Sequence, residues 1–270
     1  MKFFEGCMAL ITGASSGLGE EFAHQLAPVA KTLVLVARRN DRLVALRERL
    51  LAEYPACSVF TYRADLSQEK EREELVNWLQ KQQLPINFLV NNAGLGDSGE
   101  FSTAEWPRIR SMLDVNITAL THLTYLLLPS MLRTQGAAVL NVSSVAGFFP
   151  LPNMSVYSAT KSYVTSFSEA LAMELRPKGI IVTALCPGPI PTEFAETAAR
   201  PYEEPRIPHT HSMPAFMATP RQVVLAGLQA VVAERPRAIP NPFLALAIGV
   251  ALVIPFFLTR KVISCFRTSL

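Results

Sequence analysis

Cysteine is scarce in this sequence, and the four cysteines among its 270 residues stand far apart with no C-x-x-C pair. That spacing disfavours a zinc ribbon or a disulfide framework and favours a reducing compartment such as the cytoplasm. Charge is scarce too, because charged residues make up 17% of the chain and the formal net charge is +3. The small charge argues against nucleic-acid binding. Hydrophobic residues, in contrast, make up 50% of the chain, which is enough for a large core.

Histidine is also rare, with four in the chain. His209 and His211 form an H-x-H pair, but no acidic residue or further histidine stands near them at the spacing of metal ligands. Neither His24 nor His122 adds a convincing partner. We therefore predict no metal site.

Short apolar runs rich in β-branched residues alternate five times with longer segments of helical period. This pattern is typical of a parallel sheet with crossover helices. Right-handed crossovers predict a doubly wound, Rossmann-type α/β sheet whose ligands bind at the carboxyl ends of the strands. The expected strands are Met8–Thr12, Thr32–Ala37, Ser58–Arg63, Phe88–Asn91, Ala138–Ser143 and Ile180–Cys186, and the expected helices are Gly17–Leu26, Asp41–Glu53, Gln68–Lys81, Pro107–Leu132 (long enough for a kink) and Ser158–Leu175.

The first expected strand runs into a glycine-rich turn, "TGASSGLG", with Gly13, Gly17 and Gly19. A strand that enters a helix through such a turn points free backbone N–H groups and the positive end of the helix dipole at one place, which suits a phosphate. The turn lacks the lysine of a P-loop, so ATP is disfavoured. It predicts a dinucleotide site, with a plain tight turn as the alternative.

Two arginines, Arg38 and Arg39, follow the second expected strand. A Rossmann-type fold carries an acidic residue there for the ribose of NAD, whereas a guanidinium favours the 2′-phosphate of NADP through a charge-assisted contact. The alternative is a pair of solvated surface charges. We therefore predict NADP(H) as the preferred cofactor and keep NAD(H) open.

In "VYSATKSYV", Tyr157 and Lys161 stand four residues apart, so their side chains share one face of a helix. A nearby ammonium lowers the pKa of a phenol from its ordinary value near 10. The pair suits proton exchange between an alcohol and a ketone, while a lysine stem packed over a tyrosine ring is the alternative. Ser144, in "NVSSVAG", ends an expected strand and could hydrogen-bond the reacting oxygen.

Taken together, the sequence resembles the short-chain dehydrogenase/reductase family in its single-domain form. The resemblance implies an NAD(P)(H)-dependent oxidoreductase that interconverts a ketone and a secondary alcohol by hydride transfer. The motifs that carry it occur in the family's order across residues 7–192, and they are "TGASSGLG" at 12–19, "ADL" at 64–66, "NNAG" at 91–94, Asn116, Ser144, "YSATK" at 157–161 and "PGPIPT" at 187–192.

The resemblance implies roles for four catalytic residues. Tyr157 would exchange a proton with the substrate oxygen, and Lys161 would lower the pKa of that tyrosine and hold the nicotinamide ribose. Ser144 would position the carbonyl and stabilise the charge that grows on its oxygen. Asn116 matches the asparagine that kinks the long helix and anchors a water, and an amide that serves only the kink is its alternative.

The resemblance also implies a cofactor site. The glycine turn would surround the pyrophosphate, Asp65 and Leu66 would hold the adenine, and the segment after residue 186 would close over the nicotinamide. Ser15 and Arg38 match positions that hold a 2′-phosphate, but Ser16 stands where many NADP-preferring members carry a basic residue. The expected cofactor-binding residues are Gly13, Ser15, Ser16, Gly17, Leu18, Gly19, Arg38, Arg39, Asp65, Leu66, Asn92, Ala93, Gly94, Tyr157, Lys161, Pro187, Gly188, Ile190 and Thr192.

We assign residues 1–240 to one domain, with a substrate lid at about 193–220 where the family builds one. The lid is rich in proline and carries Met213, Phe216 and Met217, which suggests a mobile apolar cover. Such a cover indicates a lipophilic substrate such as an acyl, sphingoid, steroid or retinoid-like compound. The alternative functions are a non-catalytic nucleotide-sensing or interaction protein with the same fold, an NAD-dependent alcohol dehydrogenase, and a nucleotide-sugar dehydratase or epimerase.

Residues 241–270 form an apolar C-terminal segment with a basic tail. Phe243–Leu258 carries no charge and is interrupted by Pro255, and Arg260, Lys261 and Arg267 follow it. It could pack on the body or on a partner subunit, or insert on one side of an anionic membrane. A full span is disfavoured by its length. The family resemblance adds a homodimer or homotetramer as expected assemblies.

Overall fold

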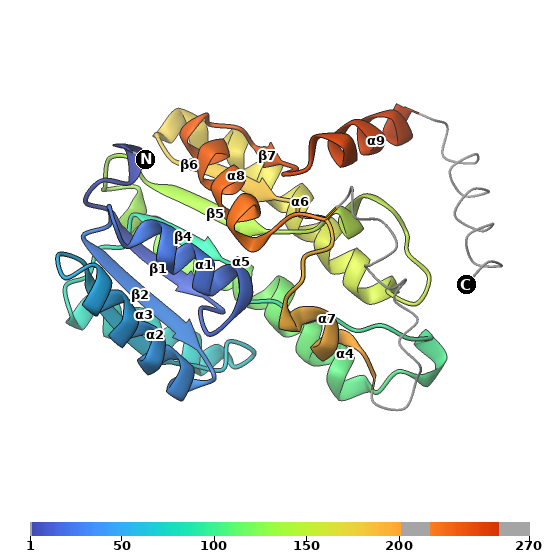
Figure 1. The fold of residues 1–270 in the computed structure, drawn as a ribbon, viewed down its shortest axis with the longest axis horizontal. Helices are drawn as coiled ribbons and strands as arrows, with labels where there is room; N and C mark the ends of the chain where they lie inside the picture. Colours follow the sequence, from blue (N-terminus) through green and yellow to red (C-terminus); the bar gives the residue numbers. More distant parts are fainter. Residues whose placement is uncertain (1, 201–216, 254–270) are drawn as a thin grey trace.

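The computed structural model describes residues 2–200 and 217–253. Seven strands within these residues form one parallel sheet in the order β3-β2-β1-β4-β5-β6-β7 (Figure 1). From β1 the chain first adds strands on one side of the sheet, up to β3, and then crosses to the other side with β4. This order confirms the predicted doubly wound Rossmann-type sheet. The strands are β1 (Met8–Thr12), β2 (Thr32–Ala37), β3 (Ser58–Arg63), β4 (Phe88–Asn91), β5 (Ala138–Val142), β6 (Ile181–Leu185) and β7 (Arg237–Ala238).

Helices cover both faces of the sheet (Figure 1). Short helices, labelled η, lie in the connections between several of these elements, and η3 joins α4 to α5. In the described residues the α-helices are α1 (Gly17–Leu26), α2 (Asn40–Glu53), α3 (Glu69–Lys81), α4 (Trp106–Leu113), α5 (Leu120–Met131), α6 (Ser155–Leu175), α7 (Glu193–Ala198), α8 (Pro220–Val232) and α9 (Pro242–Val253), and the short helices are η1 (Lys2–Phe4), η2 (Phe101–Thr103), η3 (Asp114–Ala119), η4 (Val145–Phe148) and η5 (Arg176–Lys178).

The central strands are buried on both faces, which explains their continuous apolar runs. In β1, Ala9 and Ile11 face one core together with side chains of α1, α2 and α8, while Leu10 faces a second core with side chains of α3, α5 and α6. The strand period of two produces this division. Strands β1 to β4 match the predicted bounds, β5 ends one residue earlier than predicted, and β6 is one residue shorter than predicted at each end.

The long helix expected over Pro107–Leu132 is divided in the structure. It consists of α4, the π-helical turn η3 and α5, and Asn116 lies within the π turn. A π turn shifts the hydrogen-bond register by one residue and so redirects the helix. The long helix is thus interrupted by the segment that contains Asn116, the residue that was expected to kink it.

Two elements after residue 216 were not predicted. Helix α8 begins with a capping box in which the Thr219 side chain accepts from the backbone of Gln222 while the Gln222 side chain accepts from the backbone of Thr219. It packs beside α1, where Gln25 donates a hydrogen bond to the carbonyl of Arg221. Strand β7 is two residues long and pairs with β6.

The described part of the apolar C-terminal segment is α9, which extends from the sheet edge at β7 (Figure 1). Ile248 is buried, but most of its large apolar side chains are exposed, namely Phe243, Leu246, Val250, Leu252 and Val253. No helix among residues 2–200 and 217–253 is long and apolar enough to cross a membrane. Pro255, Leu258 and the basic residues Arg260, Lys261 and Arg267 lie outside the described residues, as do His209, His211, Met213 and Phe216.

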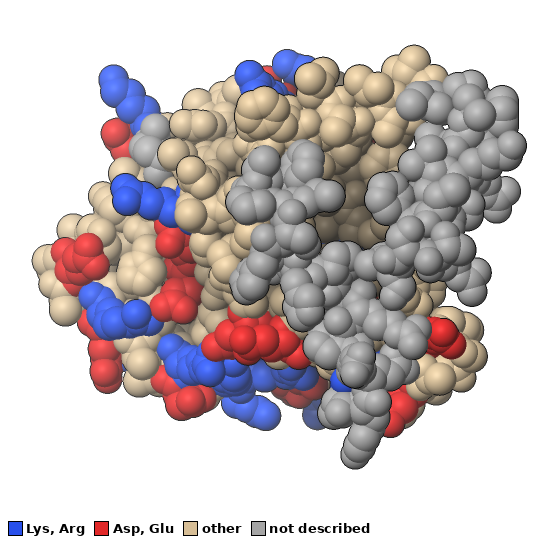
Figure 2. Space-filling model, turned by 45° about the vertical axis from the view of Figure 1, so that its right-hand side comes forward, with Lys and Arg blue, Asp and Glu red and all other residues tan. Residues whose placement is uncertain are grey.

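Acidic and basic side chains lie side by side on the face shown in Figure 2, and neither sign covers a broad area there. Uncharged side chains occupy much of the upper part of this face. This mixed distribution accords with the small net charge of +3.

Candidate active site

Four loops meet at the carboxyl ends of the central strands. The glycine turn follows β1, Asn92–Gly94 follow β4, Ser143 and Ser144 follow β5, and Pro187 lies just after β6. Parallel neighbours bring such loops to one edge of a sheet. The structure therefore gathers motifs that are up to about 175 residues apart in the sequence.

The glycine turn is packed tightly against the loop after β4. A Cβ atom on Gly13 would lie 2.9 Å from the Cα atom of Ala93, and one on Gly19 would collide with the carbonyl of Gly13. Asn92 fixes this arrangement, since its Nδ2 donates to the carbonyls of Thr12 (2.9 Å) and Gly13 (3.2 Å). The turn leads directly into α1, whose first backbone N–H groups are available to a phosphate.

The segment after β6 folds back over this turn. The Val145 backbone donates to the carbonyl of Pro187 (3.0 Å), and Ile190 packs against the core that Leu18 also contacts. The Thr192 side chain lies 3.5 Å from the position that a Cβ on Gly17 would take. The chain thus encloses, between α1 and α7, the edge where the pyrophosphate is expected.

Of the two consecutive arginines, Arg39 is the one directed at the glycine turn. Its Nε donates to Ser15 Oγ (3.2 Å) and its Nη2 to Ser16 Oγ (2.7 Å). Its Nη1 pairs with Glu193 at 2.9 Å. Arg38 is exposed. The prediction gave Arg38 the larger part in holding a 2′-phosphate, whereas the structure brings Arg39 to the two serines.

Tyr157, Lys161 and Ser144 are brought together as their spacing predicts. Tyr157 and Lys161 lie on one face of α6 with 7% and 4% of their surface exposed, and the Lys161 Nζ lies 5.7 Å from the centroid of the tyrosine ring. Ser144 caps η4 and hydrogen-bonds Tyr157. The Lys161 Nζ donates to the carbonyl of Val142 (2.9 Å). The three side chains therefore form a single buried group.

Burial is the main influence on both titratable groups. It raises the pKa of Tyr157 to about 12, and the hydrogen bond with Ser144 opposes this rise. It lowers the pKa of Lys161 to about 8. The predicted net lowering of the phenol pKa is therefore wrong for these groups as they stand, because desolvation dominates the shift and the Lys161 ammonium donates to the carbonyl of Val142. The phenol keeps its proton at neutral pH.

Asn116 connects three parts of the site from the π turn. Its Oδ1 accepts from the backbone of Leu95 (2.8 Å), and its Nδ2 donates to the carbonyl of Leu95 (2.9 Å) and to Thr160 Oγ1 (3.0 Å). A Cβ on Gly94 would lie 3.5 Å from both Asn116 Oδ1 and Lys161 Nζ. Asn116 thus holds the loop after β4 against α6 beside Lys161.

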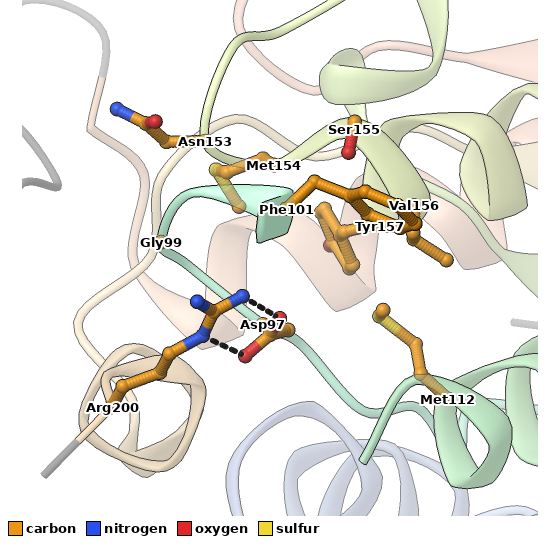
Figure 3. A pocket seen from close by; sticks show the side chains of 10 residues that line it. All are labelled: Asp97, Gly99, Phe101, Met112, Asn153, Met154, Ser155, Val156, Tyr157 and Arg200. Atoms are coloured by element: carbon orange, nitrogen blue, oxygen red, sulfur yellow. Dashed lines mark hydrogen bonds and ion pairs between the residues drawn. The ribbon is translucent and has the colours of Figure 1, made fainter. Parts of the chain in front are cut away.

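A small pocket opens next to Tyr157, and the sequence did not indicate its charged wall (Figure 3). Asp97 forms a bidentate pair with Arg200, through contacts of 3.1 and 2.6 Å, and pairs with Arg108 at 2.7 Å. Burial disfavours the ionised carboxyl, but the two arginines outweigh it and lower the pKa of Asp97. The remaining wall is mainly apolar and includes Phe101, Met112, Met154 and Val156.

Helix α7 lies across the site. The Phe194 ring packs against Tyr157 with centroids 5.5 Å apart. A Cβ on Gly96 would approach the Phe194 ring to 2.7 Å, so a glycine permits this close packing. At the other end of the helix, Arg108 Nη2 donates to the carbonyls of Thr197 (2.8 Å) and Ala198 (2.9 Å). Arginines therefore hold α7 at both ends.

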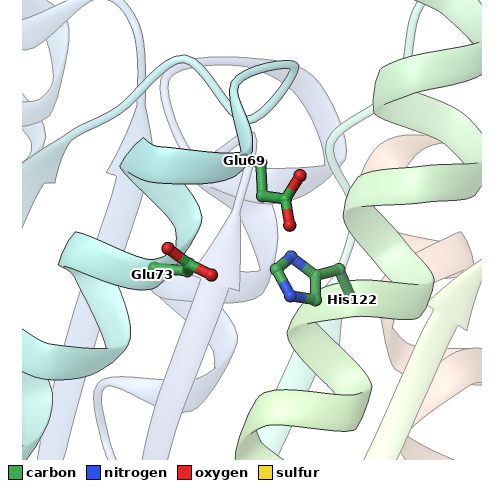
Figure 4. A group of neighbouring side chains, drawn as sticks. All are labelled: Glu69, Glu73 and His122. Carbon is green, nitrogen blue, oxygen red and sulfur yellow. The ribbon is translucent and has the colours of Figure 1, made fainter.

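Away from this edge, the structure places His122 beside two carboxylates of α3, Glu69 and Glu73 (Figure 4). One imidazole nitrogen and one oxygen of each carboxylate, the atoms that could bind a metal ion, lie within 4.8 Å of one another. The sequence analysis did not foresee these neighbours of His122. The group surrounds the buried Arg72, whose Nε donates to His122 Nδ1 at 3.0 Å. Burial lowers the pKa of Arg72, and the two carboxylates act against this effect. We therefore explain the group by compensation of the buried guanidinium.

The model of the short chain dehydrogenase family matches residues 7–203, which is most of the chain. The chain belongs to the short-chain dehydrogenase family. It is an NAD(P)-dependent oxidoreductase that acts on alcohol or carbonyl groups.

Three relatives illustrate the range of this family. A short-chain dehydrogenase from Sphingobium yanoikuyae in complex with NADPH is 34% identical, with a TM-score of 0.78 over 87% of this chain and 88% of that one. A short-chain dehydrogenase/reductase from Burkholderia phymatum in complex with NAD is 26% identical, with a TM-score of 0.79 over 92% of this chain and 93% of that one. An 11-beta-hydroxysteroid dehydrogenase from Pinus massoniana is 38% identical over 70% of this chain. That match covers 53% of the Pinus protein, so the present chain spans about half the length of that relative.

Proposed function

We propose that this dehydrogenase prefers NADP(H) and interconverts a neutral, lipophilic ketone and its secondary alcohol, with Tyr157 as the acid–base residue. The observation that carries the cofactor preference is the position of Arg39 against Ser15 and Ser16. A guanidinium and two hydroxyls at the opening of the glycine turn supply charge-assisted and neutral donors suited to a phosphate. The remaining cofactor assignments, from Asp65 to Thr192, stay predictions.

The proposed chemistry uses the buried group on α6. A nicotinamide cofactor supplies the hydride when it is bound. Tyr157 donates its proton to the carbonyl oxygen as negative charge develops there, and Ser144 donates a second hydrogen bond to the same oxygen and orients it. The Lys161 ammonium, 5.7 Å from the ring centroid, stabilises the phenolate that remains. Asn116 keeps the surrounding loop and α6 in place.

The pocket wall supports a neutral substrate. Arg200 and Asp97 line it, but each is engaged by the other, and Arg200 Nη1 also donates to the Glu100 carbonyl (2.8 Å) and to Thr103 Oγ1 (2.8 Å). The charged groups of the wall are thus compensated within the protein. The rest of the pocket wall, which a substrate would contact, is mainly apolar, and Met112 and Met154 give it adaptable side chains.

Fluorescence titration with NADPH and NADH tests the cofactor preference. Arg39→Ala is expected to weaken NADPH binding by about 10- to 100-fold, the loss of one or two charged hydrogen bonds, and to leave NADH binding unchanged. Arg38→Ala is the matched control and should change neither. Tighter NADH binding by the wild type would contradict the preference. Turnover of short polar ketones in place of long apolar ones would contradict the substrate class.

The exposed side chains of α9 favour a second property, contact with a membrane surface. Apolar residues surround the helix, and Arg260, Lys261 and Arg267 follow it in the sequence. We propose that α9 inserts into the outer layer of an anionic bilayer. The full chain should co-sediment with vesicles that contain phosphatidylserine, and Leu246→Asp should abolish this binding. The opposite result would assign α9 to contact with a second copy of the chain. In that case the wild type would not bind vesicles but would dimerise as its concentration rises, and Leu246→Asp would remove the dimer.

A further inference from the structure

Glu193 is the first residue of α7, and its carboxylate lies between two arginines. One oxygen pairs with Arg39 Nη1 at 2.9 Å, and the other pairs with Arg42 Nη1 at 2.6 Å. Hydrogen bonds from Arg42 and Arg39 lower the pKa of Glu193, so the carboxylate is ionised at neutral pH. A negative group of the chain itself thus occupies the point at which two guanidinium groups converge.

The same Arg39 also holds the hydroxyls of the glycine turn, Ser15 at 3.2 Å and Ser16 at 2.7 Å. A 2′-phosphate bound by these donors must therefore share Arg39 with Glu193 or replace it. A phosphate and a carboxylate at this distance repel each other, and both need the same guanidinium charge to balance their own. The uncharged 2′-hydroxyl of NADH meets no such repulsion.

A carboxylate is also the group that NAD-binding Rossmann folds direct at the ribose 2′-hydroxyl, from the end of the second strand. This chain has Arg38 and Arg39 at that place. We infer that Glu193 is a specificity-determining residue, which competes with the 2′-phosphate of NADP(H) for Arg39 and Arg42 and offers an acceptor to the ribose of NAD(H). The inference rests on the proposed binding of the 2′-phosphate at Arg39.

Removal of the Glu193 charge should leave α7 folded. The helix keeps its contacts at the other end with Arg108, and Phe194 keeps its packing on Tyr157 and Gly96. Glu196 provides a matched control because it is exposed on the same helix. Glu193→Gln and Glu196→Gln therefore remove the same charge from the same helix, and they differ in the contact with the two arginines.

The experiment measures the dissociation constants of NADPH and NADH for the full chain by fluorescence titration. Glu193→Gln is expected to raise the ratio of the NADH constant to the NADPH constant about fivefold, mainly through tighter NADPH binding, as two exposed ion pairs suggest. Glu196→Gln should leave the ratio unchanged. An unchanged ratio in Glu193→Gln, or weaker NADPH binding, would overturn the inference.

The proposed function and this inference fail in different ways. The proposed function concerns the ratio in the wild type and its loss in Arg39→Ala, whereas the inference concerns the change that Glu193→Gln produces. If Arg39→Ala weakens NADPH binding but Glu193→Gln leaves the ratio as it was, the inference alone is wrong. If Arg39→Ala has no effect on NADPH binding, the proposed 2′-phosphate site is wrong, and a ratio change in Glu193→Gln would not restore it.

Discussion

Lys161 is a buried cation, and its burial leads to a stability change with pH that can be measured. The side chain is 4% exposed, and its Nζ donates to the carbonyl of Val142. Burial lowers the pKa of Lys161 from 10.5 to about 8. Lys161→Met keeps the length of the side chain and removes the charge. We expect this variant to be more stable than the wild type at neutral pH and inactive.

The magnitude follows from the lowered pKa. At about 1.4 kcal/mol per pH unit, holding the charged ammonium in the folded protein costs about 3 kcal/mol at neutral pH. Between the folded and unfolded pKa values, the unfolded chain binds a proton that the folded chain has released. The free energy of unfolding therefore rises with pH in this window, by about 2 kcal/mol from about pH 7 to pH 9.5. Below the folded pKa both states hold the proton, and the cost is constant.

Urea unfolding of the wild type and Lys161→Met across this pH range gives the difference in free energy at each pH. The pKa of Cys7, raised by burial to about 12, has the opposite effect on stability above pH 9, but this effect is common to both proteins and cancels in the difference. Lys178→Met removes an exposed lysine and serves as the control. A difference that stays flat within about 0.5 kcal/mol would refute the reasoning, because surface changes produce scatter of that size.

Three further predictions concern the site. Gly19→Ala should abolish NADPH binding and lower the unfolding free energy by about 1–3 kcal/mol, since its Cβ would collide with the Gly13 carbonyl; titration and urea unfolding measure the two effects. Tyr157→Phe keeps the packing on Phe194 but removes the proton donor, so the kcat measured in a turnover assay should fall at least about 100-fold. Asp97→Asn leaves the charges of two arginines less compensated and should lower the free energy of unfolding, measured with urea, by about 3 kcal/mol. In the wild type, the Asp97 contribution should be lost as the pH falls through its lowered pKa, which thermal unfolding below pH 5 can detect.

The sheet could be predicted from the sequence because its central strands are buried on both faces. Continuous apolar runs mark such strands, and the bounds of β1 and β2 follow from them without knowledge of the partners. Strand β7 could not be predicted, since two residues carry no pattern and pairing with β6 alone defines them. Helix α8 had a signal that was overlooked, the capping box from Thr219 to Gln222 with a proline between them.

The site was predictable where a motif carries it. Tyr157, Lys161 and Ser144 come together because helix period and strand order fix their positions. The pair of Asp97 and Arg200 was missed because its members lie 103 residues apart and neither belongs to a local pattern. The direction of the shift in the Tyr157 pKa was also missed, because it depends on burial, and burial is a property of the whole fold.

The two arginines after β2 show how a single residue of register decides the chemistry. Neighbouring side chains leave an extended backbone on opposite sides, so only one of two consecutive arginines can face the glycine turn. The beginning of α2 at Asn40 gives that position to Arg39 and leaves Arg38 exposed. Once Arg39 faces the turn, it also comes within reach of Glu193, which lies 154 residues further along the chain. The same turn of the backbone that supplies a cation for a 2′-phosphate thus brings a competing carboxylate to it, and cofactor preference becomes a balance between two anions for one guanidinium.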